Sequence, residues 1–178
     1  MKDCFFVSLI DNIGLFRIAT QEPEMNLLAQ GLHAIAATLW IGGIFFAFMA
    51  LRPAAQEVLQ PRERRHLWRA AYRKFFQLVW VLISILLATG YYQLFFRFGG
   101  FANSQPYLHL MHTIGLIMVV AFFYLYFSLY GRLCRLIDTE NISAASNTLK
   151  KMRPVMAANL FLGIVITAVG VCGPYVSV

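Results

Sequence analysis

Three of the four histidines, His33, His109 and His112, lie inside stretches of sequence that contain no Asp, Glu, Lys or Arg. His109 and His112 are three residues apart, so on a helix they share one face. Met25 and Met111 lie close to these histidines in the chain. Imidazole and thioether groups together form a ligand set that suits copper, and Cu(I) in particular. These five residues are therefore candidate metal ligands.

The same histidines also fit a b-type haem. A haem iron can be held between His33 and either His112 or His109, with Gly115 one turn below His112 to leave room for the porphyrin. Arg97, Tyr91 or Tyr92 could then bind the propionates at the outer surface. A third interpretation is that the histidines only hydrogen-bond and pack, although the cost of ionisable groups in a membrane makes them functional candidates by default. The residues alone leave copper, haem and no cofactor open.

The stretches that must position these residues are long enough to cross a bilayer. Windows without a charged residue cover residues 25–51, 75–96, 106–131 and 154–178. They lack the alternating pattern of barrel strands, and lipid cannot satisfy free backbone groups, so each is predicted to be an α-helix. We expect an all-α integral membrane four-helix bundle. Its helices should span about 26–51, 74–97, 106–131 and 154–176.

Composition and charge support a membrane protein. The chain is 60% hydrophobic and 13% charged, which leaves too few polar groups to cover a soluble globule. Most of its 15 Lys and Arg residues lie between the first and second windows or between the third and fourth. By the positive-inside rule, these loops should face the cytoplasm and both termini should lie outside it. The expected partner is therefore the lipid bilayer, and nucleic acid is not expected.

Residues 1–24 precede the first window and form a predicted N-terminal segment. Asp3 and Asp11 bracket its apolar run, which makes it a poor signal peptide and favours a short amphipathic helix at the interface. The remaining residues, 25–178, form the predicted four-helix transmembrane domain.

The cysteines Cys4, Cys134 and Cys172 form an odd set without metal-motif spacing. Their number and spacing predict neither a disulfide framework nor a zinc site. Cys4 and Cys172 fall on the same predicted side of the membrane, so a pairing between them stays open.

The run from Leu32 to Gly43, in which His33 precedes a Trp-x-Gly-Gly sequence, resembles the first helix of the copper resistance D (CopD) domain. The sequence Pro-Tyr-Leu-His at 106–109 is similar to the entrance of that domain's third helix. Arg153, Asn159 and Gly163 resemble its closing helix. The resemblance covers about residues 27–175. The same arrangement is also similar to HemJ-type protoporphyrinogen oxidase, a haem-binding membrane protein.

This resemblance implies a multi-pass protein of the bacterial inner membrane that serves copper import or homeostasis. A metal site in the outer half of the bundle would use His33, His109, His112, Met111 and Met25. A periplasmic copper carrier would then be a partner. The alternative is a haem-dependent membrane oxidoreductase that passes electrons to or from a quinone, with the histidines and Arg97 holding the haem. Both groups commonly carry a lysine after the third-helix entrance, where this chain has Met111 or His112, and that departure argues against oxidase activity.

Overall fold

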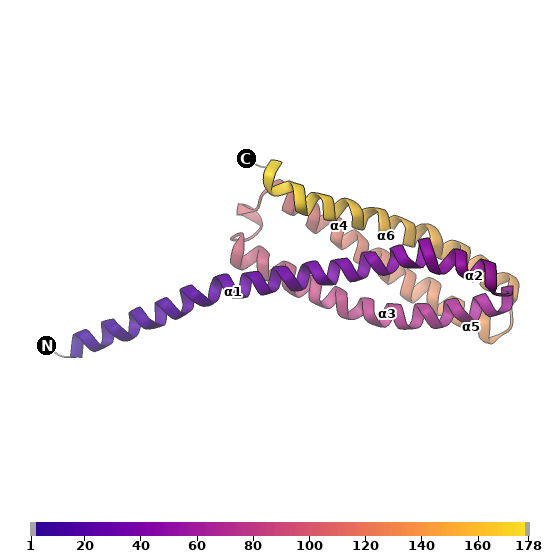
Figure 1. Cartoon of the computed structure of the whole chain (residues 1–178), viewed down its shortest axis with the longest axis horizontal. Coiled ribbons are helices and arrows are strands. Elements are labelled where there is room, and N and C mark those ends of the chain that lie inside the picture. Colours follow the sequence, from indigo (N-terminus) through magenta and orange to yellow (C-terminus); the bar gives the residue numbers. More distant parts are fainter. Residues whose placement is uncertain (1–2, 177–178) are drawn as a thin grey trace.

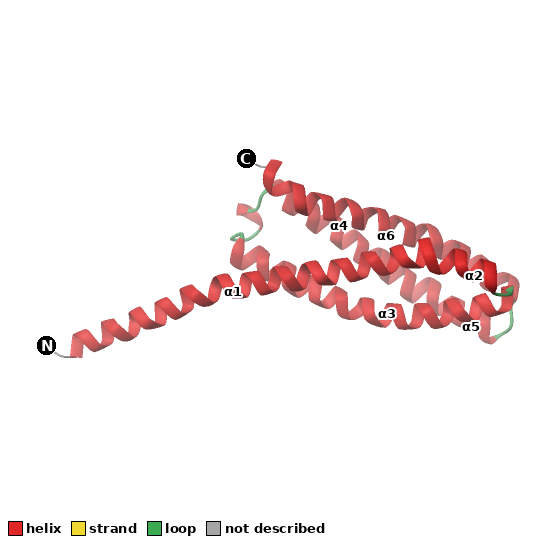
Figure 2. Cartoon of the chain, viewed as in Figure 1, coloured by secondary structure: helices red, strands yellow, loops and turns green. Residues whose placement is uncertain are grey.

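The computed structural model describes the backbone of residues 3–176 and the side chains of residues 23–176. Within this part the chain is built of helices and contains no strand (Figures 1 and 2). The prediction of an all-α bundle is therefore confirmed.

The described chain folds into long helical rods that run back and forth. The first rod contains α1 (Asp3–Phe46), η1 (Ala47–Leu51) and α2 (Arg52–Val58). The second contains α3 (Pro61–Tyr92) and η2 (Gln93–Arg97), followed by the short 3₁₀ turn η3 (Phe101–Asn103). The third contains α4 (Pro106–Phe123), η4 (Tyr124–Tyr130) and α5 (Gly131–Asp138). The last rod is α6 (Ile142–Val176). The segments η1, η2 and η4 are π-helical.

Four segments are long and apolar enough to cross a membrane, Pro23–Val58, Pro61–Arg97, Pro106–Asp138 and Ile142–Val176. All four expose large apolar side chains. Leu27, Phe127 and Phe161, for example, are 73%, 65% and 65% exposed. Such surfaces are stable only against lipid, so the chain is a multi-pass membrane protein.

The helices extend beyond the charge-free windows. Helix α6 begins at Ile142, twelve residues before the predicted beginning at Pro154, so Pro154 lies inside the helix. This proline removes the hydrogen bond to the carbonyl of Lys150. Because Lys150 is exposed, water can satisfy that carbonyl, and the helix continues. Apolar windows therefore locate the lipid-facing part of a helix and not its ends.

The predicted N-terminal segment, residues 1–24, is helical from Asp3 onward. It is continuous with the first span as part of α1, which extends past the other helices toward the N-terminus (Figure 1). The side chains of residues 1–22 lie outside the described residues, and so does the amphipathic pattern predicted for them.

The bundle is formed by two helix pairs, α1 with α3 and α4 with α6, which also pack against each other. Aromatic side chains fill the centre. Phe76 is 1% exposed and contacts Phe122 and Tyr130 edge to face, with ring centroids 5.5 and 5.3 Å apart.

Glycine allows α6 to approach α1 closely, because a Cβ on Gly163 would lie 2.7 Å from Ile41 Cγ1.

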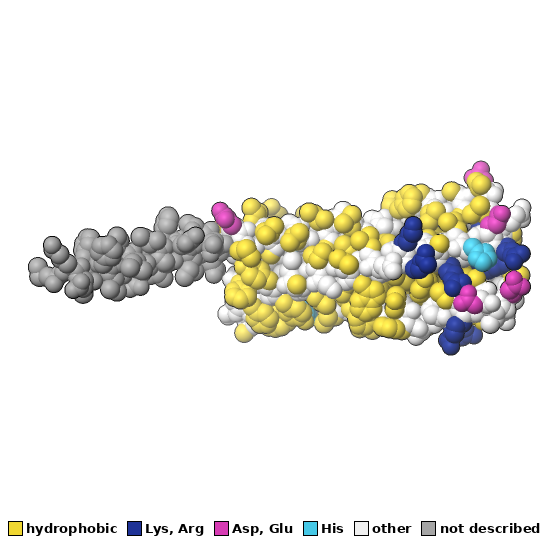
Figure 3. All heavy atoms as spheres, turned by 90° about the horizontal axis from the view of Figure 1, so that it is seen from below, with side chains coloured by type: hydrophobic (Ala, Val, Ile, Leu, Met, Phe, Trp, Pro, Cys, Tyr) yellow, Lys and Arg dark blue, Asp and Glu magenta, His cyan; other side chains and the backbone are white. Residues whose placement is uncertain are grey.

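The two ends of the bundle differ in chemistry. We call the end with the turns at 59–60 and 139–141 the basic end, and the end with the loop at 98–105 the histidine end. On the face seen in Figure 3, Lys and Arg side chains gather at one end, and apolar side chains cover the middle. The apolar middle is the part that lipid can surround.

Candidate functional site

His33 lies in the contact between α1 and α3. Its Nδ1 is 2.9 Å from the hydroxyl oxygen of Thr89, and its side chain is half-buried. Thr89 itself is 9% exposed, and its hydroxyl oxygen is 2.6 Å from the carbonyl oxygen of Ile85, one turn earlier in α3. The histidine is therefore held by a group that is itself fixed to the helix backbone.

The contacts of the Thr89 hydroxyl favour one tautomer of His33. A threonine hydroxyl has one hydrogen to donate, and here it donates to the carbonyl of Ile85. In that arrangement its oxygen accepts from His33, which places the proton of the neutral ring on Nδ1. In the neutral ring Nε2 keeps its lone pair, which is the arrangement that suits a metal-binding histidine.

Gly90 makes room for the imidazole ring. A Cβ at this position would lie 3.3 Å from Cε1 of His33 and 3.7 Å from its Nδ1. The first distance is tighter than ordinary van der Waals contact, so a larger residue would push the ring away from α3. Thr89 and Gly90 together thus position His33.

His109 and His112 lie near the start of α4 and share one aromatic neighbour. The ring centroid of Phe101, in η3, is 6.0 Å from that of His109 and 5.1 Å from that of His112. Tyr91 of α3 is 5.4 Å from His112, edge to face. Because Tyr91 directly follows Gly90, both His33 and His112 lie against the same turn of α3.

The two candidate methionines differ in their surroundings. Met111 points toward α6, where its sulfur would be 3.5 Å from a Cβ on Gly170. Met25 is 49% exposed on the first turns of the described part of α1. Gly115, expected to leave room beside His112, instead faces α6, where a Cβ would meet Ile166 Cδ1 at 3.8 Å. A side chain therefore occupies the space next to Gly115.

Arg97 connects two helical segments at the histidine end. Its Nη1 donates to Oε1 of Gln30 at 2.6 Å, which joins the end of η2 to α1. The guanidinium also lies 5.2 Å from the ring centroid of Phe98. Arg97 is exposed, so its remaining N–H groups are available to an anion.

The structure brings His109 and His112 together around Phe101 and holds His33 on the neighbouring side of α3. Among the described residues, no three His, Cys, Asp or Glu side chains converge as a metal cluster. The donor set at this end consists of separate imidazoles, and the thioether of Met111 lies against Gly170 of α6. That chemistry fits a soft, loosely held cation and does not fit a closed structural metal site.

The sequence did not single out the residues that position the candidates, namely Thr89, Gly90, Phe101 and Gln30. One usable signal was present, since small and hydroxyl residues in a membrane helix often mark a helix contact. The partner of that contact is 56 residues away along the chain, and no local pattern identifies it.

Cys172 at the histidine end is a free and exposed thiol. The predicted alternative of a pairing with Cys4 concerns a side chain outside the described residues.

The sequence profile of a family described as copper resistance protein D matches residues 69–172. No curated protein and no solved structure matches the chain. The matched residues include Thr89, Arg97, His109 and His112, whereas His33 and the Trp-x-Gly-Gly sequence precede them. The match covers more than half of the chain, so the protein belongs to the copper resistance protein D family.

Proposed function

We propose that this protein serves copper import or homeostasis and binds the copper ion, as cargo, at the histidine end. The observation that carries the proposal is the 2.9 Å contact between His33 Nδ1 and the Thr89 hydroxyl. It leaves the lone pair of Nε2 available, and a neutral imidazole nitrogen is the form that binds a metal. Membership of a copper resistance family supports copper as the ion.

The exposure of the three histidine side chains supports a path for the copper ion from the histidine end into the bundle. His109 is exposed, whereas His112 and His33 are half-buried. A cargo ion must leave each ligand as readily as it binds, so separate ligands of moderate affinity suit passage better than a closed cage. Met111, next to His112 in the chain, can add a soft sulfur donor, and Met25 a further one near the entrance.

The proposed membrane is the bacterial inner membrane, with the histidine end outside the cytoplasm and within reach of a periplasmic copper carrier. The basis is the positive-inside rule, because the cationic side chains concentrate at the basic end. A membrane-impermeant thiol reagent applied to intact cells tests this orientation. Cys172 should react when it is the only cysteine, and Cys134, near the basic end, should not. The reverse pattern would contradict the orientation.

Cu(I) binding by the purified protein in detergent, in competition with a chromogenic Cu(I) chelator, tests the function. We expect His33→Ala to lower the affinity about 100-fold, and Thr89→Val, which removes only the positioning hydroxyl, to lower it about 10-fold. His66→Ala is the matched control, because His66 is an exposed histidine of the same chain in α3, near the basic end. It should bind copper like the wild type.

Equal affinity in the wild type and in a variant with both His33→Ala and His112→Ala would contradict the copper proposal, as would unchanged cellular copper in cells expressing that variant. Oxidised and reduced absorption spectra of the same samples separate the haem alternative. A haem band that shifts on reduction and is lost in His33→Ala would mean that the protein binds haem b and not copper. The expected electron partner would then be a quinone.

A further inference from the structure

A cavity at the basic end lies far from His33, His109 and His112, and every charged side chain that lines it is a cation. Its volume is about 240 Å³, and it lies between the end of the first rod, the start of α3 and the first turns of α6. The basic side chains that line it are Arg52, Arg64, Arg65, Lys150 and Arg153. No Asp or Glu lines it.

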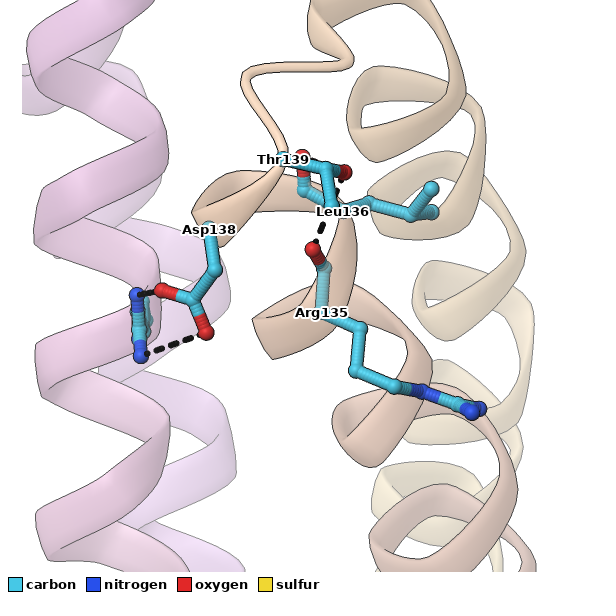
Figure 4. Close-up of polar contacts among 5 residues, drawn as sticks. Arg135, Leu136, Asp138 and Thr139 are labelled. Atoms are coloured by element: carbon cyan, nitrogen blue, oxygen red, sulfur yellow. Dashed lines mark hydrogen bonds and ion pairs between the residues drawn. The ribbon is translucent and has the colours of Figure 1, made fainter.

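Three carboxylates of the basic end have other partners, and the fourth, Glu57, is exposed and does not line the cavity. Asp138 pairs with Arg69 at 2.5 Å, and Figure 4 shows its carboxylate turned toward the neighbouring helix while Arg135 points away from it. Glu140 pairs with Arg62 at 3.4 Å. Neither arginine lines the cavity. The side chain of Glu63 accepts a hydrogen bond from the backbone N–H of Gln60 and so caps α3.

The cations that line the cavity are therefore not paired with a carboxylate among the described residues. Burial disfavours the charge of Arg153, and Arg52 and Arg64 also repel it, although Tyr72 partly offsets this. Arg65 is only 7% exposed, although a buried charge is costly unless it is paired. A bound anion would remove both penalties, since it pairs the buried guanidinium and screens its neighbours. Two features, the absence of carboxylates from the cavity lining and the burial of Arg65, thus indicate that the cavity binds an anion.

The side chains define the chemistry of that ligand. Four of the five cations are arginines, whose planar guanidinium groups match the oxygens of phosphate in pairs. Trp68 and Tyr72, stacked with ring centroids 5.2 Å apart, add an apolar wall with a hydroxyl group. The volume is below the roughly 300 Å³ at which pockets for drug-sized molecules begin, so the ligand is of headgroup size.

The depth of the cavity matches the headgroup layer of a membrane. Arg52 directly follows the first charge-free window, and Arg153 directly precedes the last one, so both lie where the lipid-facing surface ends. We propose that this cavity binds a phosphate group through Arg52, Arg64, Arg65, Lys150 and Arg153. The phosphate belongs either to an anionic lipid headgroup or to a small soluble phosphate compound.

Two probes distinguish these sources. Inorganic phosphate is titrated against the protein in a neutral detergent, with tryptophan fluorescence as the readout, because Trp68 lines the cavity. In parallel, the protein is reconstituted in nanodiscs of phosphatidylcholine with phosphatidylglycerol, and the lipids that stay bound are identified by native mass spectrometry. Retained phosphatidylglycerol supports the lipid source, and a saturable phosphate response supports the soluble source.

The decisive variant carries Arg65→Gln and Arg153→Gln. Each basic residue near an anionic headgroup contributes on the order of a fivefold factor in affinity, so the double variant should bind the active probe about 30-fold more weakly. The control removes the same charge from exposed arginines that do not line the cavity, Arg132→Gln and Arg135→Gln. It should bind like the wild type.

If the double variant does not fold, Lys150→Gln replaces it, because Lys150 is an exposed cation of the same cavity. This variant should weaken binding about fivefold. The proposal is overturned if neither probe binds, or if the control variant loses as much affinity as the cavity variant.

Discussion

The histidine end and the basic end offer opposite chemistry to a ligand. At the histidine end, imidazole rings lie among aromatic side chains, and a hydrogen bond to Thr89 helps to hold His33. At the basic end, cations surround a cavity that no carboxylate lines. The first arrangement suits a soft metal cation and the second an anion. The two proposed sites of the bundle would therefore take ligands of opposite charge.

The two halves of the bundle also differ in packing. The largest fully buried side chains of the described chain are Phe76, Phe122, Leu133, Met152, Val79 and Asn159. They lie in the centre and toward the basic end, whereas the three candidate histidines remain half-buried or exposed. A more tightly packed half thus adjoins a half with more exposed side chains. The proposed path of the copper ion lies in the more exposed half.

The largest effect on the free energy of unfolding should come from a substitution in the aromatic cluster around Phe76. Phe76→Ala should lower the free energy of unfolding by about 3 to 5 kcal/mol, because the ring is 1% exposed and is surrounded by other rings. Phe127→Ala is the matched control, since Phe127 is 65% exposed to lipid, and should cost less than about 0.5 kcal/mol. Unfolding by a denaturing detergent measures both. Equal losses in the two variants would mean that the aromatic cluster does not carry the stability.

Much of this fold can be predicted from the sequence. Lipid imposes one strict condition, the absence of charge over a bilayer thickness, and each span meets it over an unbroken window. The helix ends are less predictable, as Pro154 illustrates. Outside lipid a helix can continue through polar residues, so the windows contain no information about where it stops.

The candidate site could be predicted only in part. Depth along a helix follows from residue number, so His33 and His112 were correctly expected near the same end of the bundle. Rotation about the helix axis depends on packing between distant segments, and no pattern within α1 indicates that His33 meets Thr89 of α3. The direction in which Gly115 faces could not be predicted for the same reason. It faces Ile166 of α6 and not a vacant space.

A smaller and more specific effect should follow from changing the fit around His33. Gly90→Ala places a Cβ 3.3 Å from Cε1 of His33, so the ring must move and its bond to Thr89 should weaken. We expect Cu(I) affinity to fall about threefold to tenfold, at the lower end of what outer-shell changes cost metal sites.

Gly31→Ala is the matched control for Gly90→Ala, since both replace a helical glycine and a Cβ on Gly31 would have no neighbour within 4 Å. It should leave copper affinity unchanged. The same loss in both variants would mean that helix flexibility, and not the position of His33, governs copper binding.

The smallest effect should come from the ion pair on the rim of the basic end. Arg69 and Asp138 are 37% and 58% exposed, and pairs of this kind contribute at most about 1 kcal/mol. Asp138→Asn should therefore lower the free energy of unfolding by less than that, with a smaller loss at high salt. It should leave phosphate binding unchanged, because Arg69 does not line the cavity. A gain in phosphate affinity in Asp138→Asn, as large as the loss in the variant with Arg65→Gln and Arg153→Gln, would contradict this expectation. It would mean that the net charge of the whole basic end, and not the geometry of the cavity, attracts the anion. The two ends of the bundle would then differ in total charge and not in the geometry of a binding site.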